Sequence, residues 1–413
     1  MFNINPKISG LSRQIEDELA PFFLAFEKIT EQNQQKVLKA FHDHHVSESH
    51  FLETTGYGYN DRGREVLDDV LAQVLGCEDA LIRHSFASGT ATIVAALFGV
   101  LRPNDKVLVA TGTPYDTLHA AIGLKPASGN LTEFGITFEI VELNENQGVN
   151  FVKLEEYLKK NDYKMVYIQR SCGYSLRASL SSEECGKIAA FAKNFQPETI
   201  VFCDNCYGEF VETREPSYYG IDLLAGSLIK NPGGGIARSG GYIAGRKDLV
   251  EMCANRITAP GVGREVGASL GLNRELFLGL FNAPQLVLQC LKSAAFAAKL
   301  FEKLGFEVLP KHNETRADII QKIILKTPQN LEKFCKGLQS GAPIDSFVTP
   351  EAWDMPGYDD PVIMSAGAFT SGASSEISAD GAMRAPFAAF YQGGLNYHSA
   401  KIAIMLAASE LSA

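Results

Sequence analysis

The sequence predicts an α/β protein with a mainly parallel, doubly wound sheet and a smaller C-terminal α+β domain. From residue 80 to about 245, short apolar runs alternate with helical stretches, which is the pattern of a parallel sheet with helices on both faces. A long amphipathic helix over 286–304 then precedes further strand candidates. We therefore expect an N-terminal helical arm at 1–55, a large domain at 56–285 and a small domain at 286–413.

The composition is typical of a globular protein, with 46% hydrophobic and 21% charged residues. A formal net charge of −10 disfavours nucleic acid or an anionic membrane as the main partner. The first ten residues lack an apolar signal core, and the longest apolar run, Ile93–Leu101, is too short to span a bilayer. The eight cysteines are scattered, with one C-x-x-C pair, so we expect reduced thiols, no zinc site and a cytoplasmic location.

The N-terminal segment has apolar residues at helical spacing from Leu11 to Leu19, and we expect this helix to be interrupted at Pro21. The next helical segment ends in a histidine-rich patch, formed by His42, His44, His45 and His50. Histidines can bind a metal ion. No Cys, Asp or Glu lies at a convincing ligand spacing from them, so a polar helix end is the favoured interpretation.

A glycine-rich and aromatic segment, Thr54–Arg64 (TTGYGYNDRGR), should form an irregular loop. Such a loop either connects two elements or presents a tyrosine and an arginine to a phosphate. A helix should follow, with Val66, Val70 and Val74 on one face and Gly76 at its end.

The strands of the large domain are predicted from short apolar runs. They are Val107–Ala110, Ile136–Val141, Met165–Ile168 and Ile200–Cys203, and Phe306–Leu309 and Ile319–Leu325 are the candidates in the small domain. Ser181 and Glu184 form a capping box that should begin a helix between two of these strands. Ligands of such sheets bind at the carboxyl ends of the strands.

Two stretches near predicted strand ends could bind a ligand. Ser88, Gly89 and Thr90 precede an apolar helix, whose free amides and dipole favour an anion, although Ser88 could equally be an ordinary N-cap. Asp204 follows the strand Ile200–Cys203 and could keep a ring nitrogen of a ligand protonated, or could simply turn the chain.

Tyr115 and Lys230 complete the set of candidate residues. Tyr115, in TPYDT, could stack on a flat ring or be a half-buried loop residue. Lys230, in DLLAGSLIKNPGGG, lies between an apolar run and a glycine-rich turn, with Ser227 three residues before it. A desolvated lysine loses its proton more easily and can form a Schiff base with an aldehyde cofactor. On its own, Lys230 could equally be a surface-loop residue.

The order of these stretches resembles that of fold-type I pyridoxal-phosphate enzymes, and within them the cystathionine and methionine lyase group. The segments PYDTL, DNCYGEFVE, AGSLIKNPGGG, APGVGREVGAS and YQGGLNYHSAK are similar to one branch, the methionine γ-lyase-related family often labelled aluminium-resistance proteins. The resemblance extends from about residue 50 to the end and implies a seven-stranded-type sheet. Cys172 and Ala382 depart from it, where we would expect an arginine or other polar residue and a proline.

The resemblance implies a cofactor, pyridoxal 5'-phosphate, and a role for each candidate. Lys230 would bind the cofactor and move the substrate's Cα proton, Asp204 would pair with the pyridine nitrogen, and Tyr115 would stack on the ring as a second catalytic residue. The phosphate would be held by Ser88, Gly89, Thr90 and Ser227, with Tyr59 and Arg62 of a neighbouring subunit and Tyr57 as the alternative to Tyr59.

Two arginines are candidates for the substrate. Arg384, in DGAMRAPF, would bind the α-carboxylate, unless it forms a surface salt bridge, and Arg170, in IQRS, would face the cofactor's phenolic oxygen or the substrate. We expect a carbon–sulfur lyase that eliminates at the β- or γ-carbon of a sulfur-containing amino acid, as a dimer or a dimer of dimers.

Two alternative functions remain open at this stage. The first keeps the cofactor but changes the reaction, to that of an aminotransferase or decarboxylase, or to racemisation. The second is a non-catalytic metal- or stress-related binding protein that uses the histidine patch at 42–50. An intact Lys230 argues against this last alternative, because a protein without turnover has no need of the amine.

Overall fold

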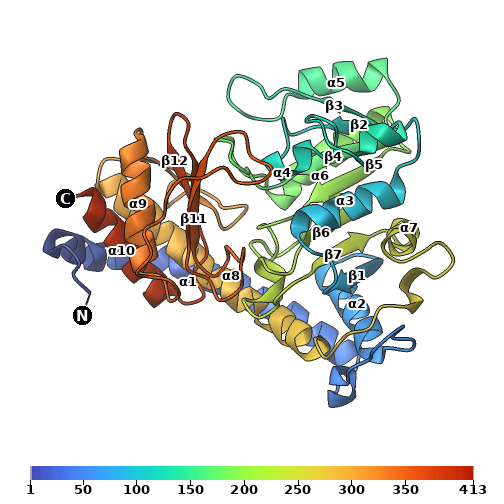
Figure 1. Cartoon of the computed structure of the whole chain (residues 1–413), viewed down its shortest axis with the longest axis horizontal. Helices are drawn as coiled ribbons and strands as arrows, with labels where there is room; N and C mark the ends of the chain where they lie inside the picture. The colour runs from blue at the N-terminus through green and yellow to red at the C-terminus, as the bar shows by residue number, and fades with distance from the viewer. Residues whose placement is uncertain (1, 413) are drawn as a thin grey trace.

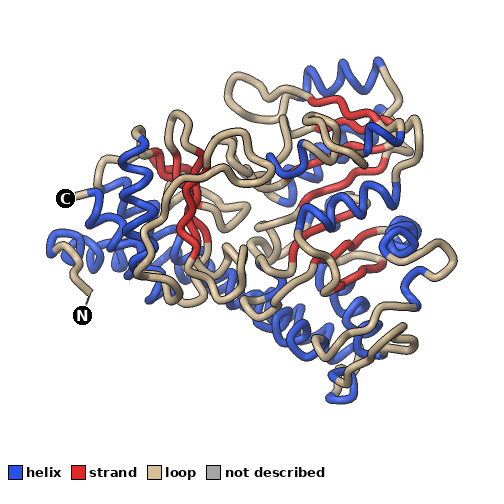
Figure 2. Tube along the Cα trace, viewed as in Figure 1, coloured by secondary structure: helices blue, strands red, loops and turns tan. Residues whose placement is uncertain are grey.

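The computed structural model describes residues 2–412 and contains two sheets held together by two long helices (Figure 1). α1 (Pro6–Asp43) and α8 (Asn273–Lys303) pack side by side and extend along both domains. The strands form two separate groups, with loops of both domains between them (Figure 2). In the described residues, no helix combines the length and the apolar character that crossing a membrane requires.

The large domain is built on a seven-stranded sheet. In spatial order the strands are β1 (Asp79–Arg83), β7 (Gly241–Gly245), β6 (Leu223–Ser227), β5 (Ile200–Asp204), β4 (Met165–Gln169), β2 (Lys106–Val109) and β3 (Thr137–Ile140). β7 is antiparallel to both of its neighbours, and all other pairs are parallel. The predicted mainly parallel, seven-stranded sheet is confirmed.

Helices cover both faces of this sheet, as expected for a doubly wound fold. One face packs against α2 (Arg62–Leu75), α5 (Phe151–Lys160), α6 (Ser182–Phe195) and α8, and the other against α3 (Gly89–Val100), α4 (Asp116–His119) and α7 (Lys247–Ile257). Successive strand residues contribute to opposite cores, because side chains alternate along a strand. Val107 and Val109 pack on the α3 side, whereas Leu108 packs on the α2 side.

Several local predictions agree with the structure. Gly76 ends α2 with a φ of 67°, which is the left-handed conformation that glycine adopts most easily. The capping box of Ser181 and Glu184 begins α6. The four predicted strands correspond to β2, β3, β4 and β5. β1 and β7 were not predicted.

The small domain has a five-stranded antiparallel sheet. Its order is β10 (Val362–Ala366), β11 (Ser378–Ala382), β12 (Ala388–Gln392), β9 (Gln321–Ile324) and β8 (Glu307–Leu309), and α9 (Pro328–Ser340) and α10 (Tyr397–Leu411) pack with α8 beside it. The two predicted small-domain strands correspond to β8 and β9. The other three strands were not predicted.

The expected interruption at Pro21 is wrong, because α1 is continuous through this residue. A proline inside a helix removes one backbone hydrogen bond and costs about 3 kcal/mol. Burial of apolar residues on both sides of Pro21 offsets this cost: Ile15 and Leu19 pack against the small domain, and Val37 packs against the large domain. The predicted boundary between the large and the small domain, at residue 285, lies inside α8. Like α1 at Pro21, α8 is continuous through its own internal proline, Pro284.

Candidate active site

A cavity of about 270 Å³ lies between the two domains. It is located at the carboxyl ends of β4, β5 and β6, where ligands of open α/β sheets bind. Its large-domain lining includes Ser88, Gly89, Thr90, Tyr115, Asp204, Ser227 and Lys230, and its small-domain lining includes Gly372, Asp380, Phe390 and Gln392. The structure therefore brings together seven of the predicted residues.

Lys230 lies three residues after β6 and is held by both domains. Its Nζ donates hydrogen bonds to the Tyr207 hydroxyl at 2.5 Å and to the Ser374 Oγ at 2.6 Å. The same nitrogen lies 4.6 Å from the centre of the Tyr207 ring. Burial lowers the pKa of Lys230, so the neutral amine is more accessible than in a surface lysine.

Asp204 is the last residue of β5, and its side chain is buried in the same cavity. One carboxylate oxygen accepts a hydrogen bond from the Cys206 amide at 3.1 Å. Burial raises the pKa of Asp204 to about 6. A positively charged group bound against this carboxylate would lower the pKa again, so Asp204 suits a ligand with a protonated ring nitrogen.

The N-terminus of α3 and Ser227 lie together at one end of the cavity. The Ser88 Oγ accepts a hydrogen bond from the Ala91 amide at 3.1 Å, and helix α3 begins at Gly89. Ser227 is buried, and its hydroxyl has no hydrogen-bond partner among the described residues. A Cβ added at Gly89 would lie 3.3 Å from the Ser227 Cβ, so glycine keeps the space between them open.

Tyr115 precedes α4 and is fixed at both its backbone and its ring. Its amide donates a hydrogen bond to Gln169 Oε1 at 2.6 Å, and its hydroxyl is hydrogen-bonded to that of Tyr358. The ring meets Tyr174 edge to face, with 5.7 Å between ring centres. Burial raises the pKa of Tyr115 well above its ordinary value, so the phenol stays protonated at neutral pH.

The small-domain wall contains functional candidates that sequence reasoning missed. Asp380 is 5% exposed, accepts a hydrogen bond from the Tyr174 hydroxyl, and accepts another from Gln392 Nε2 at 2.9 Å. The sequence of β11, SADGA, is not an apolar run, so this strand was not recognised and Asp380 was not singled out. Its partner β12 follows after the short connection 383–387, and the two strands form an antiparallel hairpin.

The structure does not bring the two predicted substrate arginines to the cavity. Arg170 is fully buried outside the cavity lining, where it bonds to Glu212 at 2.5 Å and to Asn205 Oδ1 at 2.7 Å. Arg384 lies after β11, and its half-exposed guanidinium pairs with Asp360 at 2.9 Å. In this conformation, both arginines already have partners.

The segment Thr54–Arg64, which contains Tyr57, Tyr59 and Arg62, does not contribute these side chains to the cavity of its own chain. Tyr57 and Tyr59 are 73% and 58% exposed, and their rings stack on each other with 5.4 Å between centres. A backbone hydrogen bond holds this segment, because the Gly267 amide donates to the Tyr57 carbonyl at 2.9 Å. Arg62 is exposed at the start of α2. Within one chain these three residues do not line the cavity.

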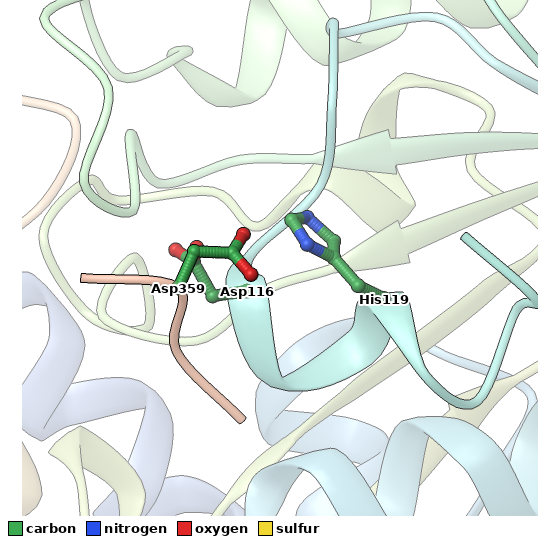
Figure 3. Close-up of side chains that lie close together, drawn as sticks. All are labelled: Asp116, His119 and Asp359. Carbon is green, nitrogen blue, oxygen red and sulfur yellow. The ribbon is translucent and has the colours of Figure 1, made fainter. Parts of the chain in front are cut away.

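The histidine patch does not form a metal-type cluster in the described residues. Its buried member, His50, accepts a hydrogen bond from the Ser47 amide at 3.1 Å and lies beside Phe277. A different group does bring three potential ligand atoms within 4.8 Å of one another: Asp116 and His119 on α4, with Asp359 on a loop of the small domain (Figure 3).

Members of this second cluster already have protein partners. The Lys125 ammonium lies 2.6 Å from Asp359, so it neutralises a charge that a metal ion would need. His119 Nε2 is hydrogen-bonded to the Pro114 carbonyl at 2.8 Å.

Comparisons with known proteins give one consistent result. The methionine gamma-lyase family matches residues 8–412. The uncharacterised protein YnbB of Bacillus subtilis is 44% identical over 400 residues, which cover 96% of this chain and 95% of YnbB.

Two solved structures match over nearly their full length. A carbon–sulfur lyase involved in aluminium resistance from Clostridium novyi NT is 46% identical, with a TM-score of 0.94. The match covers 98% of this chain and 96% of the Clostridium novyi chain. A protein from Clostridium acetobutylicum, named as a candidate cystathionine beta-lyase involved in aluminium resistance, is also 46% identical. It covers 99% of this chain and 97% of its own, with a TM-score of 0.96.

Proposed function

The chain belongs to the methionine gamma-lyase family, and from this premise we propose that Lys230 binds pyridoxal 5'-phosphate covalently and moves the substrate's Cα proton. The family uses this cofactor on the type I fold, and the chain is a carbon–sulfur lyase. One observation carries the residue assignment: a single cavity is lined by a half-buried lysine, a buried carboxylate and the N-terminus of a helix.

The residues of the cavity fit the cofactor. The buried Ser227 hydroxyl lacks a hydrogen-bond partner in the described protein, and it lies beside the free amides of α3, so both can bind a phosphate. Asp204 would lie against the pyridine nitrogen and hold it protonated. When bound, pyridoxal phosphate supplies an electron sink for negative charge at Cα.

Lys230 and Tyr115 supply the proton-transfer groups. Burial lowers the pKa of Lys230, which favours the neutral amine that can take a proton from Cα. Tyr207 and Ser374 orient that amine from two sides. The phenol of Tyr115 remains protonated, so it can donate a proton to the departing sulfur.

A second subunit supplies the arginine that one chain does not place in the cavity. Among the described residues no arginine lines the cavity, although a substrate α-carboxylate and a phosphate both favour a guanidinium. Tyr57, Tyr59 and Arg62 project from the surface, and we assign them to the phosphate of a neighbouring copy. The active form is then a cytoplasmic homo-oligomer, a dimer or a dimer of dimers.

The release of a keto acid tests the reaction. Purified protein with added cofactor is incubated with cystathionine, methionine or cysteine, and pyruvate and 2-oxobutyrate are measured. We expect keto acid and a thiol from at least one of them. Consumption of an amino acceptor without thiol release would instead identify an aminotransferase and end the lyase proposal.

A further inference from the structure

The small-domain wall of the cavity has a chemistry that neither cofactor binding nor proton transfer uses. We call the group formed by Asp380, Gln392 and Phe390, together with Tyr174 of the large domain, the acidic wall. All four side chains line the cavity. Because the cofactor-binding groups lie on the large domain, the acidic wall faces the space left for the substrate.

Asp380 is a buried carboxylate with unused acceptor capacity. One of its oxygens accepts from the Tyr174 hydroxyl and the other accepts from Gln392 Nε2 at 2.9 Å. A carboxylate has about four lone-pair positions, so about two remain after these bonds. Burial raises the pKa of Asp380, and the positive charge of Lys230 acts in the opposite direction. No other cationic side chain of residues 2–412 lines the cavity, so a cationic ligand would stabilise the ionised carboxylate.

Gln392 adds a second acceptor beside this carboxylate. Its side chain is 4% exposed, and its Oε1 has no hydrogen-bond partner among the described residues. Its Nε2 is already committed to Asp380, which fixes the amide so that Oε1 is the free atom. A buried acceptor without a donor is unfavourable, and a donor from a ligand would satisfy it.

Aromatic rings flank these two acceptors. Tyr174 lies against Phe390, with 5.1 Å between ring centres, and against Tyr115 at 5.7 Å. Aromatic faces attract ammonium groups, most strongly where water is excluded. A carboxylate, an amide oxygen and aromatic rings together match an alkylammonium group and disfavour a second carboxylate.

We propose that the acidic wall binds an ammonium group on the sulfur side of the substrate, with Asp380 as the specificity-determining residue. The inference rests on the proposed function and extends it to a substrate class. The enzyme would prefer a thioether amino acid whose sulfur-side chain carries an ammonium but no carboxylate, as in S-(2-aminoethyl)cysteine, over one with an uncharged tail, as in methionine.

A matched pair of probes tests this preference: S-(2-aminoethyl)cysteine and S-propylcysteine, which differ by an ammonium in place of a methyl group. For the loaded wild-type enzyme, Kd is measured from the change in cofactor absorbance and KM from thiol release. We expect the ammonium probe to bind about 10- to 100-fold more tightly, as for hydrogen bonds to a charged group.

The variant Asp380→Asn should remove this preference, because it weakens binding of the ammonium probe far more than binding of S-propylcysteine. Asp162→Asn, at an exposed carboxylate outside the cavity, is the matched control. Gln392→Leu should reduce the preference in the same direction by a smaller factor, and it serves as the test if Asp380→Asn does not fold.

Three results would overturn the proposal: no preference in the wild-type enzyme, equal weakening of both probes in Asp380→Asn, or a preference that survives both variants. Failure of the lyase proposal itself is distinguishable. In that case the wild-type enzyme releases no thiol from any thioether, while the Kd values still report the preference.

Discussion

The two walls of the cavity differ in charge and in architecture. The large-domain wall places Lys230, Asp204 and Ser227 at or just beyond the ends of strands, and it includes the N-terminus of α3. The small-domain wall places Asp380 and Gln392 on paired antiparallel strands. The difference indicates that one wall holds the cofactor and the other selects the substrate, so substitutions on the two walls should change different measured quantities.

The largest effect should come from Lys230→Ala. Without this amine, the covalent bond to the cofactor cannot form and the Cα proton has no base, so kcat should fall by about 10³-fold or more. Loss of the yellow absorbance band and a keto-acid assay measure the two effects. Lys333→Ala, at an exposed lysine of α9, should keep both. Full activity in Lys230→Ala would remove this residue from the reaction.

Asp204→Asn should have the next largest effect. The variant keeps the shape of the side chain but cannot hold a pyridine nitrogen protonated, so kcat should fall by about 10²-fold, as for other preorganised charges. Cofactor content, measured by absorbance after alkaline release, should stay near one per chain. A normal kcat would show that Asp204 does not face the ring nitrogen.

The same variant gives a pH signature in the cofactor-free protein. Burial raises the pKa of Asp204 from 3.8 to about 6, so its contribution to stability is fully present below pH 3.8 and is lost as the pH rises through 6. Asparagine does not ionise. The Tm of Asp204→Asn relative to wild type should therefore rise between pH 4 and pH 8, and a constant difference would contradict the assignment.

A smaller effect is expected for Ser227→Ala. Loss of one hydrogen bond to a charged phosphate should raise the Kd of the cofactor by about 10-fold, while KM for the substrate changes little because the small-domain wall is intact. Fluorescence titration of the cofactor-free protein measures this Kd. Ser340→Ala, remote in α9, is the control. An unchanged Kd in Ser227→Ala would place the phosphate elsewhere.

The smallest effect is expected for Arg384→Ala. The guanidinium forms a half-exposed ion pair with Asp360 outside the cavity, and such pairs contribute about 1 kcal/mol or less. KM and kcat should change less than about twofold. A large increase in KM, with kcat nearly constant, would instead support the sequence-based prediction that Arg384 binds the α-carboxylate, and would require it to leave Asp360.

The contrast between the walls also explains what sequence could predict. Ser88, Asp204 and Lys230 each adjoin a recognisable strand or helix start, and parallel topology brings such ends together at one edge of a sheet. Asp380 and Gln392 become neighbours only through the pairing of β11 with β12. These strands form a hairpin across residues 383–387, but the sequence of β11, SADGA, lacks the β-branched, aromatic or alternating pattern that indicates a strand.

Tertiary structure also decides two further cases: the expected interruption at Pro21 is wrong, and the substrate role of Arg384 stays a prediction. Pro21 is locally a helix-breaking residue, yet α1 passes through it because packing on both domains holds the helix on either side. Arg384 has the residue type that recognises a carboxylate, but its position relative to Asp360 depends on tertiary structure. Residue chemistry was predictable in both cases, and the tertiary environment was not.

The most direct test of the account is to locate the cofactor's covalent attachment. Protein purified with pyridoxal phosphate is reduced with borohydride, digested and analysed by mass spectrometry for a pyridoxyl group on lysine. We predict the group on Lys230, within the peptide that contains Ser227, and on no other lysine in stoichiometric amount. Attachment at a different lysine, or none, would contradict the assignment of this cavity as the active site.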